Sequence, residues 1–174
     1  MKVYKFGGAS VKDANGVRNL QQIVAQESGD LVIVVSAMGK TTNALEAMLA
    51  DLLANKDEEA LEKWEDILKF HFGIMDGLGF SDELGSEVCG KLGAWWQPRQ
   101  LRDAGVKRVF GNQIGDGSVN SKVANVYERA YDAVVSMGER MSTTIVAAYL
   151  RQCGMDAVLW DMTRLLRTDE TFRE

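Results

Sequence analysis

The sequence predicts an α/β fold with a parallel sheet, because two apolar segments flank a helical one within the first 35 residues. Val3–Phe6 is rich in β-forming residues, with Lys5 among them. Leu31–Val35 is an uninterrupted run of mostly β-branched residues, as expected for a strand covered on both faces. A strand, a helix and a second strand in this order predict a βαβ unit with a right-handed crossover.

The first strand runs into a glycine pair, and this junction is the first candidate site. Gly7 and Gly8 allow φ > 0 and close approach of a ligand to the backbone. The helix after Ser10 should present unpaired N–H groups at its N-terminus, which favour an anion. Lys5 would add a positive charge for a phosphate. An ordinary βα turn with a solvated lysine explains the same residues.

The first helix is expected over Asp13–Glu27, with Asp13 or Asn15 as its N-cap. Its apolar positions recur with a helical period at Val17, Leu20, Ile23 and Val24. The chain then turns at Gly29-Asp30.

The second strand ends in a polar segment, Ser36–Asn43, which precedes another helix. Parallel strands place their carboxyl ends at one edge of a sheet, so Ser36, Lys40 and Thr42 should lie beside Lys5–Ser10. Thr42 is also a plausible helix N-cap. Two polar, glycine-bearing loops at one edge predict a shared anion site.

An amphipathic helix is expected over Asp57–Met75, with apolar residues on one face (Leu61, Trp64, Ile67, Leu68 and Phe72). We interpret its acidic residues as solvated surface and His71 as structural. Gly77–Gly79 should end this helix, and Ser81 should cap the next. No regular pattern covers Cys89–Asn125, where the tryptophan pair at 95–96 is a lid, a contact surface or, as we favour, aromatic cover for the sheet.

A further helix is expected after Ser136–Thr144, and Met155–Trp160 is predicted to be a third strand. Glu139 follows a glycine near the start of this otherwise apolar helix. The acid could complement the helix dipole, which is worth about 0.3–1 kcal/mol. Alternatively, its carboxylate could bind the ammonium group of a substrate.

Composition excludes several classes of protein. The 174 residues include 20 Lys and Arg against 25 Asp and Glu, a net charge of -5, which argues against nucleic-acid binding. The longest apolar run is too short to span a bilayer, and we expect no signal peptide and a cytoplasmic location. Cys89, Cys153 and the single histidine show no metal-ligand spacing, so we expect neither a metal site nor a disulfide framework.

Three motifs in this order resemble aspartate kinases: Lys5–Ser10, Ser36–Asn43 and Ser136–Thr143. The segment from Trp160 to Asp169 is similar to that family as well. The family's first motif is K-F-G-G-T-S, and Ala9 departs from it at the threonine.

The resemblance implies the N-terminal portion of an amino-acid kinase fold, a three-layer sandwich with an open, mainly parallel sheet. It implies transfer of a phosphoryl group from ATP to the side-chain carboxylate of L-aspartate, the entry to lysine, threonine and methionine synthesis. By this likeness Lys5, Gly7, Gly8 and Ser10 would hold the phosphoryl group. Ser36 and Thr42 would line the aspartate pocket, and Glu139 would receive the substrate ammonium.

The family's second half has no counterpart in these 174 residues, so we expect residues 1–174 to be the acceptor-binding part of a longer enzyme. ATP and Mg²⁺ would then be held mainly by the missing half, and this chain alone would be inactive. An unprotected sheet edge would favour a homo-oligomer. A non-catalytic amino-acid-binding or assembly module with the same fold is the alternative.

Overall fold

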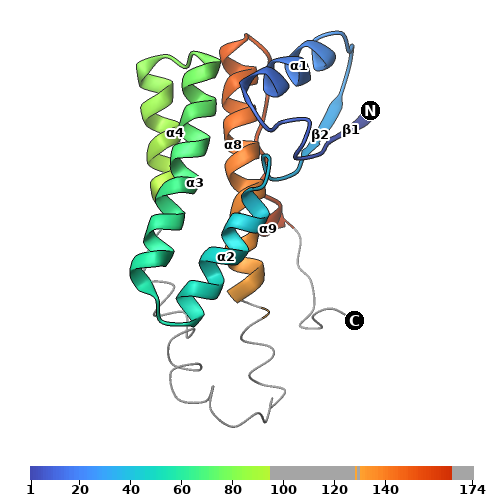
Figure 1. Ribbon diagram of the computed structural model, residues 1–174. Coiled ribbons are helices and arrows are strands. Elements are labelled where there is room, and N and C mark those ends of the chain that lie inside the picture. The colour runs from blue at the N-terminus through green and yellow to red at the C-terminus, as the bar shows by residue number, and fades with distance from the viewer. Residues whose placement is uncertain (95–127, 129, 166–174) are drawn as a thin grey trace.

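The computed structural model describes residues 1–94, 128 and 130–165 (Figure 1). Its elements follow in the order β1 (Lys2–Phe6), α1 (Ala14–Val24), β2 (Leu31–Val35), α2 (Thr41–Leu53), α3 (Asp57–Leu78), α4 (Asp82–Ala94), α8 (Met137–Gln152) and α9 (Met162–Leu165). Residues 130–135 are also helical and lead into α8. The tryptophan pair at 95–96 and the motif around residues 167–169 lie outside the described part.

The predicted βαβ unit is confirmed. Strands β1 and β2 pair in parallel, from Lys2 opposite Leu31 to Phe6 opposite Val35, and α1 connects them. Asp13 caps α1 by accepting a hydrogen bond from the N–H of Gly16 at 2.8 Å. The helix is shorter than expected and ends at Val24.

One prediction about this sheet is wrong for the described residues, because only one of its faces is covered. The covered face includes Phe6 and the buried Val35. On the opposite face Val3, Val32 and Val34 are 60%, 40% and 44% exposed. The described sheet has two strands rather than the wider sheet between two helical layers that was expected.

The predicted third strand at Met155–Trp160 is also wrong. These residues form no strand, and Val158 and Trp160 are 74% and 68% exposed. The N–H of Met155 still donates to Leu150 at the end of α8, and that of Ala157 donates to Met155. These local bonds replace the inter-strand ladder that a strand needs.

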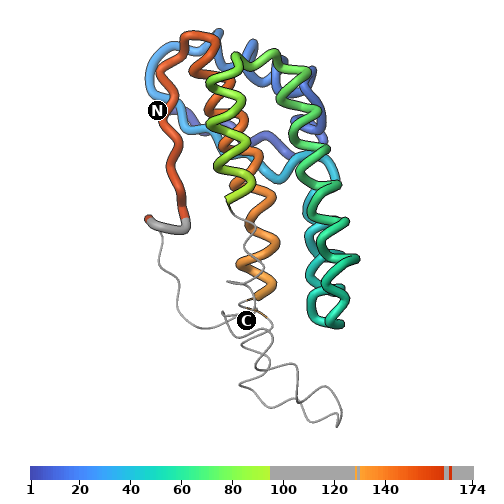
Figure 2. The backbone as a smooth tube through the Cα atoms, turned by 90° about the vertical axis from the view of Figure 1, so that its left-hand side faces the viewer, coloured from blue at the N-terminus to red at the C-terminus, as the bar shows by residue number. Residues whose placement is uncertain are grey.

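Helix α8 is the centre of the core. Its residues from Thr144 to Leu150 are all buried, so this helix is covered on every side. Figures 1 and 2 show α3, α4 and α8 running side by side as a bundle, with the sheet beside α8. The rings of Phe80 and Tyr149 stack with centroids 6.4 Å apart, and Gln152 donates to the carbonyl of Gly79, which ties α8 to the turn between α3 and α4.

Helix α3 extends to Leu78, three residues beyond its expected end, and stops where Gly79 adopts a left-handed conformation with φ 67°. No helix in the described part of the chain is long and apolar enough to cross a membrane. Cys89 and Cys153 are both free thiols.

His71 is fully buried in α3. Its Nδ1–H donates to the carbonyl of Ile67 at 2.7 Å, and its Nε2 has no hydrogen-bond partner within the described structure. Burial lowers the pKa of His71 from its ordinary 6.5, since protonation would place an unpaired N–H and a charge in the interior.

We therefore expect acid to destabilise the protein through His71. Below about pH 6.5 the imidazole of His71 binds a proton in the unfolded chain but not in the folded protein. The free energy of unfolding therefore decreases as the pH falls from this value toward the pKa of His71 in the folded state. Between about pH 7.5 and 5.5, the unfolding free energy of the wild type should fall more than that of His71→Leu. Urea titrations at both pH values measure the difference, and equal losses would contradict it.

Candidate functional site

The loops after β1 and β2 touch through their backbones. The N–H of Ser36 donates to the carbonyl of Phe6, and the N–H of Gly39 donates to the carbonyl of Gly8, each at 3.0 Å. A Cβ placed on Gly8 would lie 2.4 Å from the carbonyl oxygen of Ala37, closer than real Cβ atoms approach. The close approach of the two loops therefore requires glycine at this position.

The start of α8 packs against the same loop. A Cβ on Gly138 would lie 2.8 Å from the Cβ of Ala37 and 3.5 Å from Cγ2 of Thr41. The three segments singled out in the sequence, which follow β1, follow β2 and open α8, thus meet around Ala37.

The helix N-terminus beside this junction belongs to α2 rather than to α1. Helix α1 begins six residues after Gly8, and the carboxylate of Asp13 caps it by accepting from the N–H of Gly16. Helix α2 has Lys40 as its N-cap, with no side-chain cap bond and no acidic residue in its first turn. Its first N–H, that of Thr41, donates to the carbonyl of Met38 at 3.1 Å. The next two, those of Thr42 and Asn43, have no side-chain cap acceptor, as an anion site requires.

Thr42 is inside the first turn of α2 and is not the N-cap. The neighbouring Thr41 takes the structural role, because its buried hydroxyl donates to the carbonyl of Met38 at 2.6 Å. This leaves the half-buried side chains of Thr42 and Ser36 at the junction.

The residues of the first motif are not all placed together. Lys5 is exposed on the uncovered face of the sheet, where it pairs in register with Val34. Gly7 is exposed, and a Cβ there would meet nothing within 4 Å. Ser10 is exposed, and its N–H donates to the carbonyl of Gly7 at 2.9 Å. Within this motif, the carbonyls of Phe6 and Gly8 bond to the loop after β2, and Gly8 lies against Ala37.

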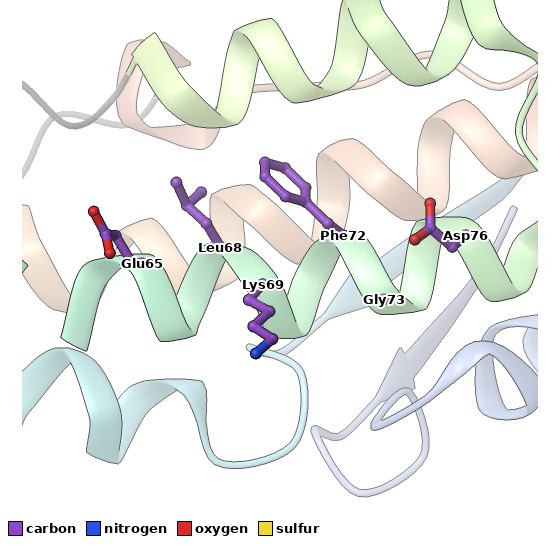
Figure 3. A pocket seen from close by; sticks show the side chains of 6 residues that line it. All are labelled: Glu65, Leu68, Lys69, Phe72, Gly73 and Asp76. Carbon is purple, nitrogen blue, oxygen red and sulfur yellow. The ribbon is translucent and has the colours of Figure 1, made fainter. Parts of the chain in front are cut away.

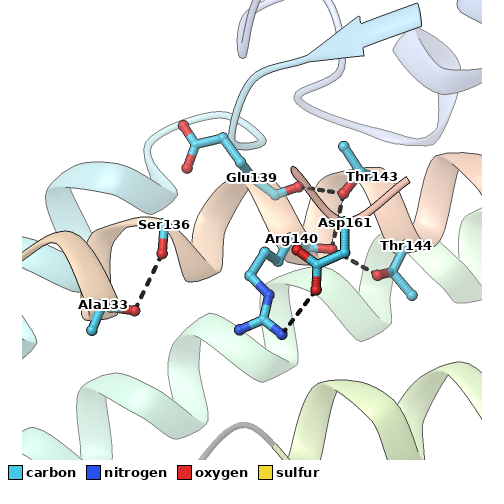
Figure 4. A network of polar contacts seen from close by, with 7 residues as sticks. All are labelled: Ala133, Ser136, Glu139, Arg140, Thr143, Thr144 and Asp161. Atoms are coloured by element: carbon cyan, nitrogen blue, oxygen red, sulfur yellow. Dashed lines mark hydrogen bonds and ion pairs between the residues drawn. The ribbon is translucent and has the colours of Figure 1, made fainter. Parts of the chain in front are cut away.

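Glu139 lies in the first turn of α8 and is half-buried. Its backbone carbonyl accepts hydrogen bonds from the hydroxyls of Ser142 and Thr143, at 3.0 and 2.7 Å. Its carboxylate forms no hydrogen bond or ion pair with any residue that the structure describes, and Figure 4 shows it pointing away from Arg140 and Asp161. Both the dipole role and a role in binding a cation are compatible with this placement.

Sequence reasoning missed Arg140 and its partner. The guanidinium of Arg140 lies 3.7 Å from the carboxylate of Asp161, which joins the start of α8 to the segment before α9 (Figure 4). The sequence offered one indication that these two residues belong to the same site, because both lie in motifs that resemble one family.

Three supporting residues were missed as well. A Cβ on Gly16 would lie 2.3 Å from the carbonyl oxygen of Ser10, so the first turn of α1 supports the Gly-Gly loop. The ring of Phe70 and the side chain of Lys12 flank Gly39, at 3.3 and 3.8 Å from the position of a Cβ there. Lys12 and Lys40 are exposed cations beside the loop after β2. Of these residues, Gly16 could have been noticed in the sequence, because glycine has a low helix propensity and this one lies in a predicted helix.

Within the described ranges, no three His, Cys, Asp or Glu side chains are grouped so that they could hold a metal ion. The groups at the junction that could bind a ligand are therefore backbone N–H groups, the hydroxyls of Ser36 and Thr42, nearby lysines and the carboxylate of Glu139. This set suits a small zwitterion that carries negative groups at one end and an ammonium at the other.

Comparison with known proteins places the chain in a family. A family model described as "Amino acid kinase family" matches residues 1–173. Lysine-sensitive aspartokinase 3 of Escherichia coli (strain K12) is 26% identical over 170 residues, 98% of this chain and 33% of that protein. Aspartokinase 2, chloroplastic, of Arabidopsis thaliana is 30% identical over 160 residues, 91% of this chain and 26% of that protein.

A solved structure agrees with this assignment. The crystal structure of E. coli aspartokinase III in complex with aspartate and ADP (R-state) matches with a TM-score of 0.59 and 23% identity, over 90% of this chain and 30% of that one. At this identity the likeness concerns the fold. The chain spans only between a quarter and a third of the length of these curated relatives. The chain belongs to the amino acid kinase family.

Proposed function

We propose that residues 1–174 are the acceptor-binding, N-terminal part of an aspartate kinase, within the three-layer sandwich of that fold. The observation that supports this most is the meeting of three separate segments around Ala37, beside the uncapped N-terminus of α2. The similar proteins are aspartokinases, and one of the matching structures is a complex with aspartate and ADP. The reaction would transfer the γ-phosphoryl group of ATP to the side-chain carboxylate of L-aspartate.

In this proposal Glu139 binds the ammonium group of L-aspartate, because its carboxylate is half-buried and has no partner among the described residues. The hydroxyls of Ser36 and Thr42 and the N–H groups of Thr42 and Asn43 bind the negative end of the substrate. The substrate carboxylate needs no general base, since it is ionised near pH 7, and catalysis requires positioning and positive charge around the phosphoryl group.

The loop after β1 is proposed to face that phosphoryl group. Gly7 leaves open space at the backbone, which fits a phosphate oxygen. Lys5 would supply charge from the uncovered sheet face, with Gly8 and Ser10 completing the loop. ATP with Mg²⁺ supplies the activated phosphoryl group, and we propose that residues outside this chain hold most of it.

The acceptor role predicts a specific loss of binding in Glu139→Gln. Removing the charge that pairs with the ammonium should weaken L-aspartate binding about 10- to 100-fold, equivalent to the loss of one charge-assisted hydrogen bond. Isothermal titration calorimetry measures this change. Glu83→Gln, which removes an exposed carboxylate in the first turn of α4, is the matched control and should bind like the wild type.

A kinase assay separates this proposal from its alternatives. We expect the chain to bind L-aspartate yet release no ADP from Mg-ATP. Aspartate-dependent ADP release that Lys5→Ala abolishes would identify a complete kinase. It would contradict the proposal that residues outside this chain hold most of the ATP. No binding of L-aspartate by the folded chain would overturn the acceptor site itself. The homo-oligomer expected from the uncovered sheet is tested separately, by analytical ultracentrifugation.

A further inference from the structure

An open groove lies between α3 and α4, on a different face of α3 from Phe70 and the loop that Phe70 contacts. The groove has a volume of about 540 Å³, and the described residues that line it all belong to α3: Glu65, Leu68, Lys69, Phe72, Gly73 and Asp76. This spacing of three, four and seven residues defines a single face of α3. Figure 3 shows the side chains of Leu68 and Phe72 pointing from α3 toward α4.

The floor of this groove is apolar and incompletely covered. Leu68 and Phe72 pack against the core yet are only partly buried. Two helical turns before Leu68 on the same face, Leu61 is 42% exposed and continues the apolar stripe. A Cβ on Gly73 would meet nothing within 4 Å, so another backbone can approach α3 there. The lining spans roughly 16 Å, about three helical turns.

The rim of the groove is acidic. Glu65 and Asp76 lie toward its two ends, while Lys69 points away from α4 (Figure 3). Glu58 and Glu62, on the same side of α3, are exposed and extend the negative charge. Neither Glu65 nor Asp76 forms an ion pair within the described structure. A second copy presenting this same face would oppose like charges, so symmetric self-association through the groove is unfavourable.

We propose that this α3–α4 groove binds a basic amphipathic helix of a partner protein. Apolar side chains of that helix would cover Leu68 and Phe72, and Lys or Arg residues near its ends would face Glu65 and Asp76. Anchors at intervals of three, four and seven residues are the usual way in which a helix occupies such a groove. The acidic rim sets the sign of the partner's charge and excludes anionic surfaces. The site is independent of the proposed aspartate pocket.

The first test uses a fluorescent peptide of about 18 residues of Leu and Lys with an amphipathic helical pattern, at physiological salt. Its control is a peptide of the same composition in scrambled order, which keeps the charge and loses the apolar stripe. We expect the patterned peptide to bind at least about tenfold more tightly. The double variant Glu65→Gln/Asp76→Asn should lose at least about tenfold in affinity, whereas Asp30→Asn/Asp156→Asn, which removes the same charge at exposed sites elsewhere, should not.

Cys89 gives a second readout that reports position. This half-buried α4 residue lies close to Asp76, and burial together with the charge of Asp76 raises the pKa of the Cys89 thiol. In a Cys153→Ser background, the patterned peptide should slow the labelling of Cys89 by a thiol reagent, and the scrambled peptide should not.

Four results would overturn the proposal. Equal binding of the two peptides would show attraction by charge alone. Unchanged binding by Glu65→Gln/Asp76→Asn, or unchanged labelling of Cys89, would place the peptide elsewhere. A dimer of the free protein that dissociates in Phe72→Ala would identify a second copy as the occupant. The paired charge variants alter only surface carboxylates, so a loss of binding cannot be attributed to unfolding.

Discussion

Gly8→Ala should destabilise the protein by about 3 kcal/mol and abolish the L-aspartate binding proposed above. The added Cβ would lie 2.4 Å from the carbonyl oxygen of Ala37 and 3.3 Å from that of Gly39. Both neighbours are backbone atoms, so the two loops must separate, and the bond from the N–H of Gly39 to the carbonyl of Gly8 is lost with them. Overpacking and one lost hydrogen bond together account for the expected size. Urea unfolding and calorimetry measure the two effects.

Gly7→Ala is the matched control for this experiment. It makes the same chemical change one residue earlier, where a Cβ meets nothing within 4 Å and φ is not positive. Its stability should stay within about 0.5 kcal/mol of the wild type. Equal effects at the two glycines would mean that the contact between the loops is not what requires glycine, and the description of the junction around Ala37 would fail.

Ile145→Ala should cost about 2–5 kcal/mol of unfolding free energy, a large part of the total stability of a small domain. Ile145 is completely buried in the middle of α8, the helix that is covered on every side. Its truncation removes apolar contacts and leaves a cavity that the surrounding helices can fill only in part. Chemical denaturation followed by circular dichroism measures the change.

The control is the same substitution at a more exposed position. Ile23 in α1 is 38% exposed, and Ile23→Ala should cost less than about 1 kcal/mol because alanine also favours the helix. A cost at Ile145 no greater than at Ile23 would contradict the central place of α8 in the core.

Local sequence patterns determined several elements of this fold. The period of apolar residues, with Asp13 at the start of α1 and Gly79 at the end of α3, predicted the βαβ unit and the long amphipathic helix. These features depend on neighbours within one or two helical turns, so a single sequence contains the information. The three motifs could also be located from the sequence, since each follows a strand or begins a helix.

Other predictions failed where the outcome depended on distant partners. Met155–Trp160 has the composition of a strand, but a strand exists only when another strand accepts its hydrogen bonds, and none does so among the described residues. Leu31–Val35 has the composition of a strand that is covered on both faces. Which of its faces is covered depends on which helices pack against the sheet. Composition reports that a residue favours burial and does not report which element will bury it.

The three segments of the candidate site could thus be identified from local sequence patterns, whereas the way they meet depends on tertiary packing. Gly8 and Gly138 are glycines because Ala37 occupies the space that their side chains would need. The same packing places the start of α2, which has no side-chain cap, beside this junction, and it places Lys5 on the uncovered face of the sheet. Such contacts join residues that are far apart in the chain. Because the interior is close-packed, each contact depends on where the other elements of the fold lie.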